Sequence, residues 1–154
     1  MARFFRRGIS KIHFLPAVAG ASPTRAEITA GDPLSPYIAA INGFQLTNSA
    51  IPVPNLEDAF TSQIEGEDTV GDSGFTFNDD TVDDAVRDLL PKGTNGFILL
   101  MPYGDVPTKR CEVWPARVSG YNDMWTTGND PAQAAVQLVI TEVPNQNGVI
   151  PALT

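Results

Sequence analysis

The spacing of apolar residues in the middle of the chain predicts one helix between two strands. Residues 75–101 read FTFNDDTVDDAVRDLLPKGTNGFILLM. Apolar side chains recur there at helical spacing, which predicts an amphipathic helix over about residues 80–90. They are Val82, Ala85, Val86, Leu89 and Leu90. The apolar run Phe97–Met101 is typical of a strand covered on both faces. A helix of about three turns is marginal alone, so the rest of the chain should supply a sheet.

Polar residues and turn residues mark both ends of this helix. Side-chain oxygens that can cap its first turn come from Asn78, Asp79 and Asp80. The helix dipole favours acids in that turn, and Asp83 and Asp84 supply them. At the other end, Pro91 disfavours helical geometry at the residue before it, and Gly93 lets the chain turn back. We found no second convincing helix.

Elsewhere, short apolar and alternating stretches between turn residues predict about seven short strands. These are expected among nine candidate stretches: Lys11–Leu15, Glu27–Thr29, Tyr37–Ile41, Phe44–Ala50, Phe60–Ile64, Phe75–Phe77, Phe97–Met101, Lys109–Ser119 and Ala134–Val143. Pro115, inside one of the longest candidates, implies a bulge or an edge position. These elements predict a mainly β fold with one helix (α+β). Two packed antiparallel sheets would form a β-sandwich or partial barrel, flanked by that helix.

Turn signals divide the strands. Asn42-Gly43 predicts a tight hairpin between its two neighbouring strands. Pro52 and Pro54 lack N–H donors, so residues 50–59 are predicted as an extended loop outside any sheet. The polar stretch 120–131 is predicted as a loop. The tail 144–154, rich in proline and asparagine, is predicted to be loose or docked on a neighbouring molecule. The length of 154 residues fits a single domain, residues 1–154.

Charge is unevenly distributed along the chain. The formal net charge is −8, which opposes tight binding to nucleic-acid phosphates and to anionic membranes. Residues 1–12 form a basic arm that contains Phe4 and Phe5 but no acid, whereas residues 57–88 carry eleven acids and one base. Adjacent phenylalanines are costly to leave in water, so the arm is predicted to meet a partner surface, with a disordered tail as the alternative. Lys11, His13 and Pro16 interrupt the apolar stretch near the start, so we expect no signal peptide. No apolar run has the length of a membrane span.

The sequence offers few residues suited to catalysis or to metal binding. The single Cys111 excludes an internal disulfide and is predicted to be a buried, inert thiol. His13 is the sole histidine, which argues against a histidine-based triad or zinc site. The acids before the helix do not follow the calcium-loop pattern. Glu65 and Glu67 could act as the paired acid and base of a glycosidase, but only their presence supports this alternative. We therefore expect no enzyme activity, no cofactor and no metal.

Three longer stretches resemble a known family. They are ISKIHFLPAVAGASPTRAEITAGDPLSPYIAAINGF (9–44), SQIEGEDTVGDSGFTFNDDTVDDAVRDLL (62–90), and the closing pair CEVWPARVSGYN (111–122) with DPAQAAVQLVITEVP (130–144). In these stretches the chain resembles the major tail (tail tube) proteins of long-tailed phages (siphophages), particularly those infecting actinobacteria. The resemblance covers most of the chain and consists of long patterns rather than catalytic motifs.

The resemblance implies a structural virion protein. Copies would join through sheet edges into hexameric rings, and the rings would stack into a hollow tube through which double-stranded DNA passes without specific contacts. Tape measure, tail terminator and baseplate proteins would be further partners. Assembly would take place in the bacterial host cytoplasm, and the location would be the virion tail.

The resemblance also implies an arm and a long loop that reach between rings. In this sequence these map to the basic arm and to residues 50–59, with the ring-stacking residues Phe4, Phe5, Arg6, Arg7, Pro52, Val53 and Pro54. Candidate acids for the lumen or the ring interface are Glu57, Asp58, Glu65, Glu67 and Asp68. The principal alternative is a monomeric β-sandwich carbohydrate-binding module that uses Trp125 and Tyr121. A hydrolase that uses carboxylates is the third hypothesis, after the tube protein and the carbohydrate-binding module.

Overall fold

The structure, a computed structural model, describes residues 2–80 and 85–153. Within these residues the chain forms twelve strands, two α-helices and one 3-10 helix. In chain order they are β1 (Lys11–Leu15), α1 (Arg25–Ala30), β2 (Asp32–Pro33), η1 (Ser35–Tyr37), β3 (Ile38–Asn42), β4 (Leu46–Asn48), β5 (Ile51–Val53), β6 (Ser62–Ile64), β7 (Asp68–Val70), β8 (Ser73–Asn78), α2 (Ala85–Leu89), β9 (Asn95–Met101), β10 (Arg110–Met124), β11 (Gln133–Ile140) and β12 (Asn145–Val149).

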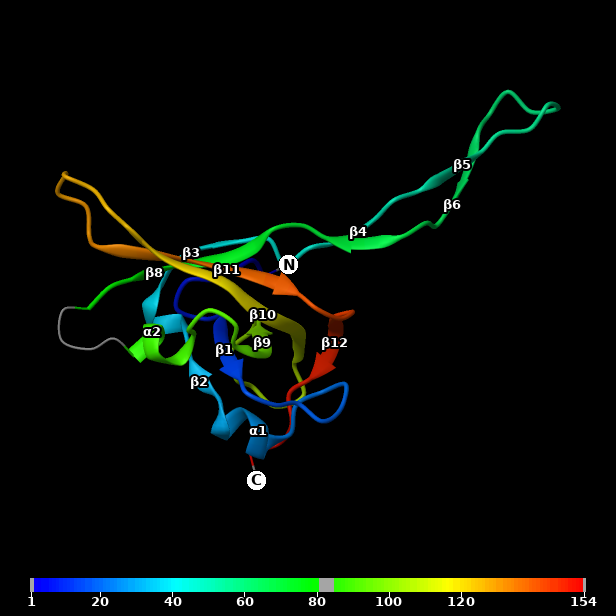
Figure 1. The fold of residues 1–154 in the computed structure, drawn as a ribbon. Helices are drawn as coiled ribbons and strands as arrows, with labels where there is room; N and C mark the ends of the chain where they lie inside the picture. Colours follow the sequence, from blue (N-terminus) through cyan, green and yellow to red (C-terminus); the bar gives the residue numbers. More distant parts are fainter. Residues whose placement is uncertain (1, 81–84, 154) are drawn as a thin grey trace.

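The body of the molecule is one antiparallel sheet that folds over its own core. The strand order is β2-β1-β9-β10-β11-β8-β3, and β12 pairs with β10. The fifteen-residue β10 joins the two halves, because it pairs with β9 and β12 in its first part and with β11 in its second. Figure 1 shows β8 and β11 crossing over β1 and β9. The mainly β, antiparallel prediction is confirmed, and the two predicted layers are the halves of a single bent sheet.

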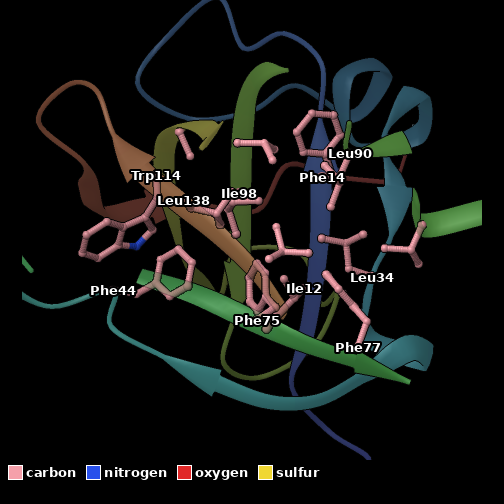
Figure 2. Close-up of a cluster of buried hydrophobic side chains, with 14 residues drawn as sticks. Ile12, Phe14, Leu34, Phe44, Phe75, Phe77, Leu90, Ile98, Trp114 and Leu138 are labelled. Atoms are coloured by element: carbon pink, nitrogen blue, oxygen red, sulfur yellow. The ribbon is translucent and has the colours of Figure 1, made fainter. Parts of the chain in front are cut away.

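Aromatic side chains from both halves of the sheet fill the main core (Figure 2). Trp114 of β10 is fully buried and meets the ring of Phe44 edge-on, with 5.6 Å between ring centroids. Phe44 in turn stacks on Phe75 at 5.2 Å, and Phe75 lies 5.6 Å from Phe77. Phe44 follows β3, so this aromatic row fixes the point where the chain leaves the body.

A smaller buried cluster lies around α1 and β12. Its members are Leu15, Ile28, Leu99, Met101, Cys111, Val113 and Ile150. Burial raises the pKa of the Cys111 thiol to about 11, since the charged thiolate is poorly solvated there. A thiol with such a pKa stays protonated at neutral pH, in agreement with the predicted inert role.

The helix α1 was missed by the sequence analysis, which predicted a strand at Glu27–Thr29. The hydroxyl of Thr24 accepts a hydrogen bond from the Glu27 backbone N–H at 3.2 Å, and the Glu27 carboxylate accepts one from the Thr24 N–H at 2.8 Å. This reciprocal pair is a capping box, whose Thr-x-x-Glu signature is present in the sequence. The helix has only six residues, too few for an apolar stripe to stand out.

The second helix is where the apolar stripe predicts it, in shorter form. α2 spans Ala85–Leu89, and Val86 and Leu90 are buried in the main core. Asn78 ends β8, and the Asp79 N–H extends that pairing to the Ala132 carbonyl. The first turn that these residues and Asp80 were predicted to cap falls at residues 81–84, outside the described residues, so the cap stays a prediction. Of the remaining residues predicted for this helix, Val82, Asp83 and Asp84 lie outside the described residues.

The hairpin predicted at Asn42-Gly43 does not form. β3 pairs with β8 and β4 pairs with β7, so the chain continues outward instead of turning back. Gly43 has a φ of +82°, and a Cβ there would overlap the Asp72 carbonyl oxygen. Glycine thus serves a close approach of two backbones rather than a two-residue turn.

Two segments predicted as loops contribute strands. The stretch 120–131 begins as strand, since β10 runs on to Met124 opposite Gln133. The tail is ordered as well: β12 pairs with β10, and Ile150 is buried. Pro115, which was predicted at a bulge or an edge, lies opposite Phe97 of β9, between the β12-paired and β11-paired parts of β10.

Arg25 fixes the C-terminal segment to the body. Its guanidinium pairs with Asp105 at 2.9 Å and donates hydrogen bonds to the carbonyls of Pro151 at 2.9 Å and Ala152 at 3.1 Å. We expect Arg25→Ala to lower the free energy of unfolding at neutral pH by about 1–3 kcal/mol, because it leaves a half-buried carboxylate and two carbonyls without their donor.

Acid should reduce this loss. The hydrogen bond from Arg25 holds the pKa of Asp105 below its ordinary value of 3.8. A carboxyl with a lowered folded pKa contributes stability above its unfolded pKa and loses it as the pH falls through the folded value. Urea unfolding should therefore show a smaller wild-type-to-variant difference near pH 2 than near pH 7. Arg110→Ala is the control, since that arginine is more exposed and lies 3.9 Å from Glu112. An equal effect of both substitutions would contradict the role of Arg25.

Candidate assembly surfaces

The most prominent feature of the surface is an extended hairpin, residues 46–70, that projects from the body (Figure 1). It consists of two short ribbons in succession, β4 with β7 and β5 with β6. The prediction of an extended loop at 50–59 therefore falls on the outer part of this hairpin. Pro52 nevertheless lies in a strand, opposite Gln63. A two-stranded ribbon has open edges on both sides, where proline is tolerated, so the exclusion of Pro52 from strands was wrong.

Side chains and a glycine join the two ribbons. The Asn48 amide group donates to the Gly66 carbonyl at 3.0 Å and to the Asp68 carboxylate at 2.6 Å, and its oxygen accepts from the Gly66 N–H at 3.1 Å. The Ser49 N–H donates to the Glu67 carbonyl at 2.9 Å. A Cβ at Gly66 would overlap the Ser49 carbonyl oxygen. The junction therefore has a defined geometry that positions the outer ribbon.

The tip of the extended hairpin is also built by local hydrogen bonds. The Asn55 side chain accepts from the N–H groups of Glu57 at 3.0 Å and Asp58 at 2.9 Å, and the Asp58 carboxylate accepts from the Phe60 N–H at 3.0 Å. These contacts are side-chain turns that replace sheet pairing. They leave Leu56 fully exposed and Phe60 74% exposed.

Apolar side chains are exposed along the whole outer hairpin. Besides the two at the tip, they are Ile51, Val53 and Ile64. Apolar residues gathered on a thin ribbon cannot be buried against the hairpin's own body, and such gatherings mark interaction sites. The five acids predicted for a lumen or ring interface, Glu57, Asp58, Glu65, Glu67 and Asp68, all lie on this same hairpin. Leu56 was not predicted from the sequence, although it is an apolar residue within a polar loop.

The N-terminal arm carries the second exposed apolar group. The chain turns at residues 6–10, where the N–H groups of Ile9 and Ser10 donate to the Arg6 carbonyl, and the Ser10 hydroxyl donates to the Pro102 carbonyl at 2.7 Å. Before that turn, Phe4 packs against Tyr103 with 5.6 Å between ring centroids, whereas Phe5 remains 75% exposed. The predicted arm therefore ends before Ile12, which is buried in β1.

The hairpin of β10 and β11 does not form a sugar-binding platform. Trp125 at its end is 90% exposed. Tyr121 lies four residues earlier, about 13 Å along an extended strand, and the Arg87 guanidinium lies over its ring at 5.1 Å from the centroid. Arg87 is itself paired with Asp123 at 3.0 Å. The two aromatic rings thus do not stand together as a stacking surface.

The described part of the chain shows no constellation of catalytic groups. Among these residues, no group of three or more His, Cys, Asp or Glu side chains is arranged to hold a metal ion. The resolved pKa shifts have structural causes: burial lowers the pKa of His13, and the Thr24 backbone N–H lowers the pKa of Glu27. No described helix is both long and apolar enough to cross a membrane.

Known proteins resemble this chain in sequence pattern and in fold. A family model described as "Phage tail tube protein" matches residues 1–153. Among solved structures, the fold is similar to a chain in a structure described as "Cryo-EM structure of the anti-feeding prophage (AFP) baseplate, 6-fold symmetrised", with a TM-score of 0.62 and 8% sequence identity. The similarity covers 92% of this chain and 95% of that chain. No curated protein sequence matches the chain.

Proposed function

Because the chain belongs to the phage tail tube protein family, we propose that it polymerises as stacked hexameric rings into a hollow tail tube through which genomic DNA passes. The chain is a structural protein of the phage tail, and therefore of the virion, in a family that is structural rather than enzymatic. The similar baseplate structure is described as 6-fold symmetrised, and this symmetry supports the hexameric ring.

The extended hairpin is the observation that carries this proposal. It exposes five apolar side chains on a ribbon that its own body cannot cover. The bent sheet also ends in two strands, β2 and β3, whose open edges can pair with other chains. A contact between unlike surfaces closes into a ring or advances into a filament, so two such contacts per copy are enough to build stacked rings.

The arm and the hairpin provide the contacts between rings in this proposal. Phe4, Phe5, Arg6 and Arg7 act from the arm, and Pro52, Val53 and Pro54 act from the hairpin, next to its five acids. Acids that reach the channel would repel DNA phosphates, and screening limits this repulsion to about 8 Å at physiological salt. The duplex then slides through without specific contacts.

Other tail components complete the proposed assembly. A tape measure protein would occupy the growing tube, and terminator and baseplate proteins would bind its two ends. Assembly would take place in the cytoplasm of the bacterial host. Origin from a long-tailed phage of actinobacteria stays a prediction of the sequence resemblance.

Polymerisation tests the proposed function directly. The purified protein, concentrated or seeded with fragments of tail tubes, should elongate into hollow filaments visible by negative-stain electron microscopy. Averaged end views should show six subunits around a central channel. A protein that remains monomeric at every concentration, with and without seeds, would refute the proposal.

A further inference from the structure

A groove of about 360 Å³ lies between α2 and the segment that joins β2 to η1. Its walls are largely apolar and its rim is acidic: Leu34, Tyr37, Val86 and Leu89 form the walls, and Asp32 and Asp88 stand at the rim. The volume falls within the range of roughly 300–1,000 Å³ that is typical of ligand pockets. A single aromatic side chain with cationic neighbours matches this combination of walls and rim.

The surroundings of the groove are negatively charged. A smaller hollow shares Tyr37 and Val86 with the groove and is lined by Asp79 and Asp80. Arg87, the one cation among the residues that line the two hollows, is paired with Asp123. Asp32 and Asp88 line the groove, and Asp79 and Asp80 line the hollow beside it, so a cationic segment is the expected occupant.

The N-terminal arm has the complementary composition. Phe5 is 75% exposed and stands among Arg3, Arg6 and Arg7, with no acid in the chain before Glu27. Residues 2–5 precede the turn at Arg6, and four extended residues span about 13 Å. The arm can therefore reach a neighbouring molecule while its turn remains anchored on Pro102.

The arm does not lie at the groove of its own chain. Phe4 packs on Tyr103 of the loop between β9 and β10. The groove is lined from α2 and from the segment that joins β2 to η1, and neither Phe4, Phe5 nor Tyr103 is among its lining residues. A second copy of the chain is thus the natural source of the arm that fills the groove.

We propose that Phe5 of one copy inserts into the groove beside α2 of a copy in the adjacent ring, where Arg3, Arg6 and Arg7 face its acidic rim. The inference rests on the proposed polymerisation and assigns the surface that receives the arm. The apolar walls supply affinity for the ring of Phe5, and the charges select the arm over the acidic extended hairpin.

Disulfide trapping between two singly substituted proteins tests this contact. To keep the ring of Phe5, Phe4→Cys protein is mixed with mass-tagged Leu89→Cys protein, polymerised and oxidised; the buried Cys111 does not compete. The expected result is about tenfold more mixed disulfide dimer than with Val143→Cys as the partner, because a seated arm raises the effective thiol concentration. Val143 is 80% exposed and does not line the groove.

Charge reversal provides a second measurement. Arg6→Glu with Arg7→Glu should lower the yield of mixed dimer, and Asp32→Lys with Asp88→Lys in the groove partner should restore it. Tubes that form with no preference for Leu89→Cys over the control would overturn the assigned groove and leave the proposed function intact. A protein that carries both cysteines provides the last test. If its disulfide forms within single molecules, at dilutions where no tubes form, the assigned contact between copies would also be overturned. Absence of tubes under all conditions would overturn both.

Discussion

A variant whose extended hairpin is replaced by a tight turn is expected to fold normally and to form no tubes. The change replaces residues 50–66 by Asn-Gly. Ser49 and Glu67 are joined by a backbone hydrogen bond of 2.9 Å, so their strands can be linked by a two-residue turn, for which Asn-Gly is favoured. No residue between 50 and 66 belongs to either buried cluster. The free energy of unfolding should therefore change by less than about 1 kcal/mol.

The loss of polymerisation follows from the side chains that the deletion removes. Leu56 and Phe60 are the most exposed apolar residues of the hairpin, and a fixed tip presents them to a partner. Interface anchors contribute about 2 kcal/mol or more each. Two of them together amount to about 4 kcal/mol, which is roughly a thousandfold in the concentration at which tubes grow. Sedimentation and negative-stain imaging at concentrations where the wild type polymerises measure this change.

Point substitutions separate the hairpin's side chains from its length. Leu56→Ser with Phe60→Ser keeps the hydrogen bonds that Asn55 and Asp58 make at the tip, and should impair polymerisation almost as much as the deletion. Thr61→Ser changes an exposed neighbour and should polymerise like the wild type. If the shortened variant forms tubes at the wild-type concentration, the hairpin has no part in assembly.

Elements whose pattern is local were predictable from the sequence. β1 spans Lys11–Leu15 as predicted, and β8, β9 and β11 match their apolar stretches within a few residues. Their alternating or continuous apolar residues indicate directly which side chains are buried. Elements defined by distant partners were not predictable in this way. β12 has almost no apolar residues and is a strand because it pairs with β10.

The Asn42-Gly43 pair shows how a distant partner overrides a local signal. The dipeptide favours a hairpin, but Ile41 pairs with Phe75, and the reversal takes place at the far end of the extended hairpin. Register in a half-buried sheet is set by its buried face, which here includes Phe75 and Phe77. Burial of these two rings outweighs the preference of one turn.

The assembly role of the candidate surfaces stays a prediction. Phe4 and Phe5 were selected because adjacent exposed phenylalanines are costly in water, and Pro52 and Pro54 because their segment corresponds to the long loop that the family resemblance implies. The acids could be assigned to a surface only after the structure brought them together on one hairpin. The groove beside α2 could not be predicted, because its walls come from segments some fifty residues apart, such as Leu34 and Val86.

The largest expected loss of stability comes from Trp114→Ala. The indole is fully buried between the two halves of the sheet and contacts Phe44 edge-on (Figure 2). Truncating a buried tryptophan to alanine costs about 3–5 kcal/mol, through lost transfer free energy and the cavity left behind. For a chain of this length, each kcal/mol lowers the melting temperature by about 2–4 °C. Urea unfolding and thermal melts followed by circular dichroism measure both quantities.

Trp125→Ala is the matched control, because it removes the same side chain from a site that is 90% exposed. It should change the free energy of unfolding by less than about 0.5 kcal/mol. A loss of similar size in both variants would mean that the described core does not hold the fold together.

Trp114 also connects core packing to assembly. Its partner Phe44 stands at the root of the extended hairpin, with its N–H donated to the Ser73 hydroxyl at 3.1 Å and a φ of +59°. A non-glycine residue held at positive φ depends on its surroundings for that conformation. Loss of the indole should therefore loosen the direction in which the hairpin leaves the body. At temperatures where Trp114→Ala is still folded, we expect fewer and shorter tubes than for the wild type. If the folded variant grows tubes as the wild type does, the direction of the hairpin does not depend on this core packing.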